Sequence, residues 1–123
     1  MSERLYAVRG ATKVASNDVN AILGATEELL RELMGRNELA KEDMVSCLFT
    51  CTEDLDAEFP AVAARRMGLS AVPLLCAREI DVHGALPRVI RLLVHCYADE
   101  SSPARHVYLR DAVSLRKDLQ GAQ

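Results

Sequence analysis

The sequence predicts an α+β or α/β-like domain, built from a mixed sheet with one long and one short helix. Apolar stretches typical of strands are interrupted by two stretches of helical periodicity, which gives the order β-α-β-α-β-β-β. The chain has 123 residues, the length of one domain. A chain of this length buries roughly two thirds of its unfolded surface in one core. We therefore treat residues 1–123 as a single domain.

The first strand is expected from Leu5 to about Arg9, where Gly10 closes it. Composition leaves two alternatives for Arg9: a charge at the strand end that reaches solvent, or a cation held in a buried strand. Both alternatives place a guanidinium at the edge of the predicted core, so Arg9 is a candidate for binding an anion.

The long helix should begin after Ser16 or Asn17, either of which can cap it, with Asp18 in its first turn. Gly35 or Asn37 can end it. Its charged residues form a solvated side and do not indicate a site. Its apolar face, which should cover one face of the sheet, consists of Val19, Ile22, Leu23, Leu29, Leu30, Leu33 and Met34.

A strand is expected from Met44 to about Thr52, and a short helix from Pro60 to Met67, where proline suits the first turn. In that strand one side should carry Val45, Cys47, Phe49 and Cys51. The tail, residues 116–123, has little apolar content and is expected to be flexible. The other expected elements are a strand from Ala71 to Ala77, a turn near His83 and Gly84, a strand from Arg88 to Ala98, a turn from Asp99 to Pro103 and a strand from Arg105 to Leu109.

Composition argues against several classes of function. A net charge of −3 with 27% charged residues gives no electrostatic reason to expect nucleic acid or a membrane as partner. No apolar run reaches ~18 residues, and the N-terminus lacks the apolar core of a signal peptide. Because no CxxC pair is present, the cysteines should be reduced core residues of a cytoplasmic protein: Cys47, Cys51, Cys76 and Cys96.

The patterns of metal and nucleophilic chemistry are also missing from the sequence. His83, His95 and His106 are not spaced as metal ligands with acidic residues or cysteines, so we expect no metal. There is no Gly-rich phosphate loop and no serine in a nucleophile elbow. Cys76 lacks an evident base, which makes a core thiol the default interpretation.

Arg91 is the least expected charge in the chain, because it lies inside the apolar run VIRLLV. A buried unpaired guanidinium costs several kcal/mol, so an anion must meet it. That anion is either a carboxylate of the protein or a ligand. Arginines at strand positions, together with one glutamate and one tyrosine, suit the binding of a small molecule with several carboxylates.

Five segments together extend over nearly the whole chain and follow the pattern of one known family: VRGAT (8–12), TEDLDAEFPAVAAR (52–65), VPLLCAREIDV (72–82), RVIRLLV (88–94) and RHVYLRDAVSLR (105–116). Through these segments the chain resembles the AroH class of chorismate mutases. The resemblance implies a mixed five-stranded sheet packed on one long helix. It also implies a homotrimer that forms a pseudo-barrel, with active sites in clefts between neighbours.

The reaction that the resemblance implies is the Claisen rearrangement of chorismate to prephenate, in phenylalanine and tyrosine synthesis. It is unimolecular and needs no nucleophile, proton transfer or cofactor. The enzyme has to hold the flexible dicarboxylate in its reactive shape and stabilise the negative charge that grows on the ether oxygen.

The resemblance also assigns roles to residues. Arg91 matches the cation facing the ether oxygen and one carboxylate, and Arg9 matches a carboxylate-binding arginine that Tyr108 assists. Glu79 and Cys76 match the pair near the ring hydroxyl. The matching wall positions are Phe59, Ala61, Leu74 and Leu75, and the tail that should close over the mouth includes Leu115 and Arg116.

Three positions depart from the family pattern: Val62 replaces a frequent lysine, Leu75 a threonine and Lys117 a proline. We expect them to affect affinity more than chemistry.

Cys76 and Glu79 have opposite parity along the strand, which directs their side chains to opposite faces of the sheet. They reach one pocket only if the strand ends or bulges between them. Two other interpretations remain open: a ligand-binding trimer without turnover, and an assembly protein whose arginines pair across subunits with Glu79 or Asp81.

Overall fold

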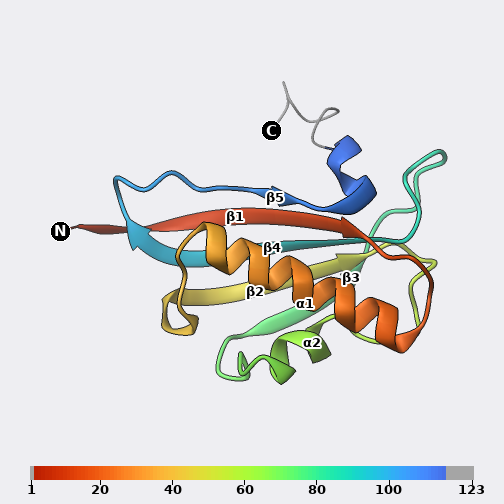
Figure 1. Ribbon diagram of the computed structural model, residues 1–123, viewed down its shortest axis with the longest axis horizontal. Coiled ribbons are helices and arrows are strands. Elements are labelled where there is room, and N and C mark those ends of the chain that lie inside the picture. The colour runs from red at the N-terminus through yellow and green to blue at the C-terminus, as the bar shows by residue number, and fades with distance from the viewer. Residues whose placement is uncertain (1, 116–123) are drawn as a thin grey trace.

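The computed structural model describes residues 2–115 and has the predicted α+β class, with a mixed sheet of five strands (Figure 1). The strands are β1 (Glu3–Lys13), β2 (Met44–Cys51), β3 (Leu74–Arg78), β4 (Val89–Asp99) and β5 (Val107–Tyr108). The helices are α1 (Val19–Arg36) and α2 (Ala61–Arg66), with short 3-10 turns η1 (Lys41–Asp43) and η2 (Arg110–Ala112).

The strand order across the sheet is β3-β2-β4-β1-β5. The pairs β1–β4 and β2–β4 are antiparallel, whereas β2–β3 and β1–β5 are parallel. The long strand β4 therefore lies in the centre, and β5 is a short edge strand. Among the described residues, no helix is long and apolar enough to cross a membrane.

One face of the sheet is covered by α1 and α2, and the core lies between them and the strands (Figure 1). The buried side chains alternate along most of β2 and β4, as a half-covered sheet requires. From the strands they include Val8, Phe49, Leu92 and Val94, and from α1 they include Ile22, Leu29, Leu30 and Leu33. The long predicted helix and its role as the cover of one face are confirmed.

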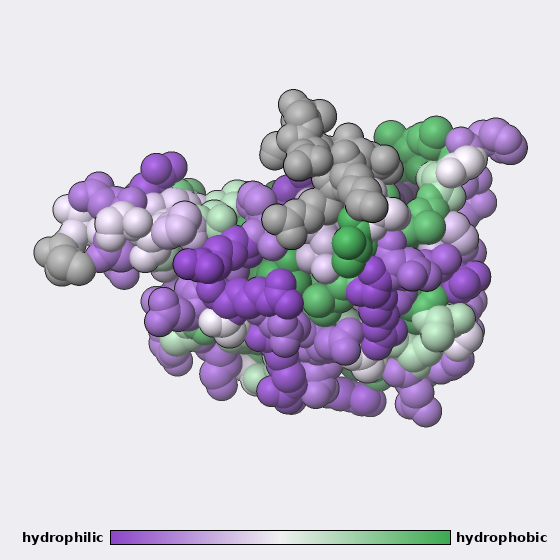
Figure 2. Space-filling model, turned by 45° about the horizontal axis from the view of Figure 1, so that its top comes forward, coloured by the Kyte–Doolittle hydropathy of each residue, from purple (hydrophilic) through white to green (hydrophobic). Residues whose placement is uncertain are grey.

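The other face, which we call the open face, is not covered by any described helix. It presents Leu5, Leu75 and Tyr97, whose exposed fractions are 48%, 59% and 49%. Apolar side chains of this size on a sheet face are typical of a surface that packs against something else. In contrast, hydrophilic side chains occupy much of the surface seen in Figure 2.

The first strand was predicted to stop at Arg9, and this was wrong: β1 continues to Lys13. Gly10 does not end the strand but lies buried inside it. A Cβ at Gly10 would be 3.1 Å from Leu29 Cδ1 and 3.3 Å from Leu92 Cδ1. The glycine therefore lets α1 approach the sheet closely.

Two further predictions of local structure were wrong. Asp18 is the N-cap of α1 and not a residue of its first turn: its carboxylate accepts the Ala21 N–H at 2.8 Å and the Ser16 hydroxyl at 2.5 Å. These bonds lower the pKa of Asp18. Val45 is exposed because the β2–β4 register shifts between Met44 and Ser46, which removes Val45 from the buried side.

Candidate active site

One row of residues crosses all five strands on the open face. Thr50 on β2 pairs with Ala77 on β3 and with Arg91 on β4, and Ala11 on β1 pairs with Arg91 and with Tyr108 on β5. The row runs Ala77–Thr50–Arg91–Ala11–Tyr108. The small side chain of Ala11 leaves space between the guanidinium of Arg91 and the phenol of Tyr108.

This space is a cleft of about 330 Å³, which we call the arginine cleft. Arg9, two residues before Ala11 on β1, also lines it. The other walls are mainly apolar: Gly10, Ala11, Leu48, Phe49, Ala77, Leu92 and Leu93, together with Thr50. The structure thus brings together three predicted site residues: Arg9, Arg91 and Tyr108.

A carboxylate of the protein meets Arg91, which is the first of the two partners expected from the sequence. Arg91 Nε donates to Glu79 Oε2 at 3.1 Å, and the Thr50 hydroxyl donates to the same oxygen at 2.6 Å. Glu79 is the more buried partner, with 16% of its side chain exposed against 34% for Arg91. Two donors on one oxygen fix the carboxylate beside the guanidinium.

Thr50 is a site residue that sequence reasoning missed. The only available signal was its strand parity, which placed it opposite the core-facing cysteines. Its contact with Glu79 depends on the β2–β4 register, which the sequence does not specify.

The lining of the arginine cleft contains two guanidinium groups and no carboxylate. Glu79 binds only Nε of Arg91, and the terminal nitrogens of that guanidinium bond to no described residue. The Tyr108 hydroxyl likewise has no hydrogen-bond partner in the part of the chain that the structure describes. These groups, directed into a partly apolar cleft, are suited to binding an anionic molecule.

Cys76 and Glu79 do not share a pocket within one chain. Cys76 packs against the core on the helix-covered face, and β3 ends at Arg78. The Glu79 N–H donates to the Cys51 carbonyl at 2.8 Å, and the Glu79 side chain turns to Arg91 on the open face. The strand ends where the parity argument requires, but the two side chains remain on opposite faces.

Cys76 lines a second cavity of about 370 Å³, which we call the Phe59 pocket. Its walls include Phe59, with 65% of the residue exposed, and Pro60. Of the other predicted wall residues, Ala61 is buried at the start of α2, Leu74 is half-buried against the core, and Leu75 is exposed on the open face. Leu115 is half-buried, and Arg116 lies outside the described residues.

A small acidic pocket of about 130 Å³ adjoins the arginine cleft through Arg91. It is lined by Glu53, Asp81 and Glu79 among others. A hydrogen bond to Asp81, which the protonated Glu53 carboxyl donates, and the negative charge of Asp81 raise the pKa of Glu53. This pair joins the turn after β2 to the segment after β3, and its negative charge makes the pocket unsuited to an anion.

The thiols of the core are poor nucleophiles. Burial, with a smaller effect of Cys76, raises the pKa of Cys47 and of Cys51 to about 12. All four cysteines are free, as predicted, although Cys76 is only half-buried. Among residues 2–115, no group of three or more His, Cys, Asp or Glu side chains is arranged to hold a metal ion.

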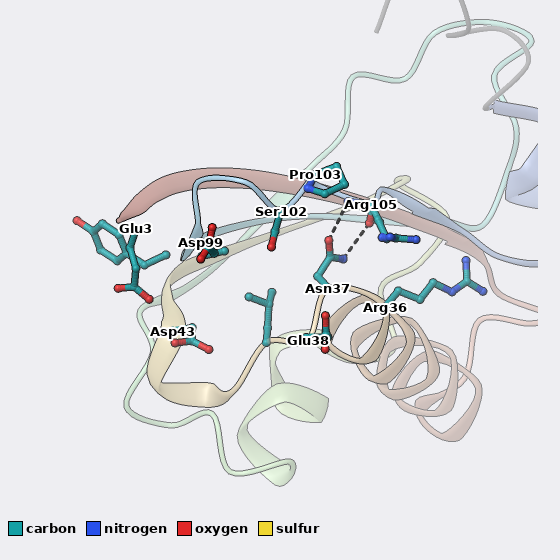
Figure 3. Close-up of a pocket in the computed structure, with 12 residues that line it drawn as sticks. Glu3, Arg36, Asn37, Glu38, Asp43, Asp99, Ser102, Pro103 and Arg105 are labelled. Carbon is teal, nitrogen blue, oxygen red and sulfur yellow. Dashed lines mark hydrogen bonds between the residues drawn. The ribbon is translucent and has the colours of Figure 1, made fainter. Parts of the chain in front are cut away.

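A further cavity, of about 300 Å³, lies at the other end of the sheet, where β1 begins and β4 ends (Figure 3). Asn37 at the end of α1 binds the backbone of Arg105 there, by donating to its carbonyl at 2.9 Å and accepting its N–H at 2.8 Å. These bonds attach the segment before β5 to the helix.

Comparisons with known proteins agree with the resemblance. The family described as chorismate mutase type I matches residues 5–119. The chain is 48% identical to a chorismate mutase AroH of Thermus thermophilus, over 94% of this chain and 97% of that protein. It is 40% identical to a chorismate mutase AroH of Bacillus subtilis, over 91% and 90%. A solved chorismate mutase structure from Clostridium thermocellum superposes with a TM-score of 0.85 at 43% identity and covers 89% of this chain and 98% of its own.

Proposed function

The chain belongs to the chorismate mutase type I family and is an isomerase of aromatic amino-acid biosynthesis, and we propose that the arginine cleft carries out its reaction. The substrate, chorismate, has two carboxylates and rearranges to prephenate within a single molecule. The observation that carries the proposal is the set of two guanidinium groups and one phenol in a cleft whose lining holds no carboxylate.

Arg91 is proposed as the group that stabilises the transition state. As the C–O bond breaks, negative charge grows on the ether oxygen, and a cation fixed in place interacts more strongly with the transition state than with the substrate. Glu79 and Thr50 hold Arg91 through its Nε, so its terminal nitrogens remain available for the substrate. No part of this role requires a proton transfer or a bound cofactor.

Arg9 and Tyr108 are proposed to bind a carboxylate of the substrate. They lie on the two adjoining strands β1 and β5 and line the same cleft as Arg91. A carboxylate held there and an ether oxygen held at Arg91 restrict the substrate to a compact conformation. This restriction removes part of the entropic barrier of a flexible molecule.

The assay adds chorismate to the purified chain and follows the loss of its absorbance together with the formation of prephenate. Turnover that is lost in Arg91→Ala supports the proposal. Binding without turnover indicates a ligand-binding trimer, and no binding indicates an assembly protein.

The active assembly is proposed to be a cytoplasmic homotrimer with each active site between two subunits. The arginine cleft holds Arg9, Arg91 and Tyr108, whereas Phe59 and Cys76 line the Phe59 pocket, so no single cavity of one chain unites the predicted site residues. Exposed Leu5, Leu75 and Tyr97 on the open face supply an apolar surface for association. A neighbour would then bring its Phe59 and Cys76 to the arginine cleft.

Complementation tests this composite site. Arg91→Ala removes the cation from one wall, and Phe59→Glu places a negative charge on the other, at an exposed position that should tolerate it. Each variant alone should be inactive. Co-expressed chains should regain activity, because about one quarter of the interfaces then combine two intact walls. No recovery from verified hybrid trimers would show that the two walls do not share a site.

A further inference from the structure

His106 contacts the backbone of a proposed substrate-binding residue. The Arg9 N–H donates to His106 Nδ1 at 3.0 Å. An imidazole nitrogen that accepts a hydrogen bond carries no proton, so this contact requires the neutral ring with its proton on Nε2. His106 lies two residues before Tyr108, and both Arg9 and Tyr108 line the arginine cleft.

The ring occupies the place of a missing ladder bond. β1 and β5 are parallel, with Gly10 opposite Val107, and Leu109 N–H donates to the Ala11 carbonyl at 2.9 Å. If this ladder continued toward the start of β5, the Arg9 N–H would donate to the Arg105 carbonyl. That carbonyl accepts instead from Asn37 Nδ2 (Figure 3), and the His106 ring accepts the Arg9 N–H.

We infer that His106 is a positioning residue: its neutral ring holds the edge strand that carries Tyr108 against Arg9, and protonation of the ring releases it. This inference rests on the proposed function of the arginine cleft. A protonated Nδ1 would place a second donor against the Arg9 N–H. It would also add a positive charge close to the Arg9 guanidinium.

The surrounding charges favour the neutral ring at physiological pH. Burial, followed by the charge of Arg9, lowers the pKa of His106 below its ordinary value of 6.5. On α1, Glu28 is paired with Arg110 at 3.1 Å, and Asn37 is bound to the Arg105 backbone. No carboxylate among the described residues is a cause of the shift. The contact is therefore expected to persist at pH 7 and to be lost in acid.

The test compares kcat/KM of three proteins between about pH 5 and about pH 9. Wild type should lose kcat/KM below the pKa of His106, by about tenfold per pH unit, mainly through KM. In His106→Asn the amide oxygen can accept the Arg9 N–H but does not titrate, so this acid limb should disappear while activity at neutral pH is retained. His83→Asn, in the exposed connection between β3 and β4, is the matched control and should keep the limb.

A histidine NMR titration of the wild type provides a readout that is independent of turnover. The expected result is a His106 ring protonated on Nε2 that titrates below pH 6.5. A ring protonated on Nδ1 at neutral pH, or an acid limb that survives in His106→Asn, would overturn the inference. A wild type that does not consume chorismate would instead remove the proposed function and leave the titration result intact.

Discussion

Thr50 shows how single atoms prepare the cleft. Its hydroxyl and Arg91 Nε bind the same oxygen of Glu79, at 2.6 Å and 3.1 Å. The carboxylate is thereby fixed before a substrate arrives, and Arg91 is fixed with it. Because the Arg91 guanidinium is ordered before the substrate binds, less entropy is lost when the transition state forms.

Replacing Thr50 by valine should lower kcat/KM because the Glu79 carboxylate loses one of its two donors. A hydrogen bond to a charged group contributes about 1.5–3 kcal/mol, so a loss of ~10-fold or more is expected. Thr50→Ser retains the hydroxyl and should stay within about twofold of the wild type. Steady-state kinetics on the three proteins measure this, and equal losses in both variants would point to a packing role for the threonine methyl group.

At the residue scale, the sequence identified the unusual cation and left its partner open, with Glu79 as one candidate across a subunit boundary. Arg91 was predicted as a charge inside an apolar strand that requires an anion, and Glu79 is that anion in the structure. Three of the predicted site residues, Arg9, Arg91 and Tyr108, line one cleft. The contact of Thr50 was not predictable because it depends on register between strands far apart in the sequence.

At the scale of elements, Gly10 sets the distance between α1 and the sheet. A Cβ there would lie 3.1 Å from Leu29 Cδ1 and 3.3 Å from Leu92 Cδ1, which is closer than ordinary contact. Leucine ends can shift by a few tenths of an ångström, but in a packed core this movement has a cost. β1 therefore keeps a glycine at the point where the helix crosses it.

Alanine substitutions at Gly10 and Gly24 should change the free energy of unfolding in opposite directions. Gly10→Ala should lower the free energy of unfolding by about 1–3 kcal/mol through overpacking. Gly24→Ala, on the exposed side of α1 with nothing within 4 Å, should raise it by about 0.5–1 kcal/mol. Urea unfolding of both variants measures the difference. Stabilisation by Gly10→Ala would show that the helix is not held close by this glycine.

Local patterns predicted the existence and order of the seven main elements but were weaker at their ends. The 3.6-residue periodicity identified α1, yet the choice of Asp18 as cap depends on which side chain reaches the Ala21 N–H. The strand rule treated Gly10 as a stop, because a glycine that is selected by a neighbouring helix looks the same in the sequence as one that ends a strand. The bulge that exposes Val45 likewise depends on pairing with β4.

At the scale of the whole molecule, the open face is the feature that a single chain leaves unexplained. Its apolar side chains and its cleft lie on the same side of the sheet, so association would bury the first and enclose the second. Resemblance to the family suggested the trimer, and strand parity already raised the separation of Cys76 from Glu79, which the structure shows within one chain.

Sedimentation equilibrium should find three chains per particle at micromolar concentration. A charged residue at Leu75, such as Leu75→Glu, should shift the particle toward monomer and reduce activity, because that side chain is 59% exposed on the open face. Ser70→Glu, at an exposed position before β3, is the control and should leave the assembly unchanged. A fully active monomer would contradict the proposed composite site.

The rate at which bound substrate rearranges, kcat, should depend little on pH between about 6 and about 9, because no proton moves in the proposed chemical step. From pH 6.5 upward most His106 rings are neutral, since the pKa of His106 is lowered from 6.5, and the contact with Arg9 is retained. The measurement is kcat across the range in buffers of constant ionic strength. A bell-shaped profile centred near neutrality would indicate acid–base catalysis instead.

The central claim is that the positive charge of Arg91 stabilises the transition state. Replacing Arg91 by citrulline keeps the shape, the Nε–H that donates to Glu79 and one terminal NH2 group, but it replaces the other terminal nitrogen by an oxygen and removes the charge. If the charge acts on the breaking C–O bond, kcat should fall by ~10²–10³ or more while substrate binding persists. A near-normal kcat in the citrulline protein, with only KM raised, would show that Arg91 anchors the substrate and that its charge does not drive the reaction.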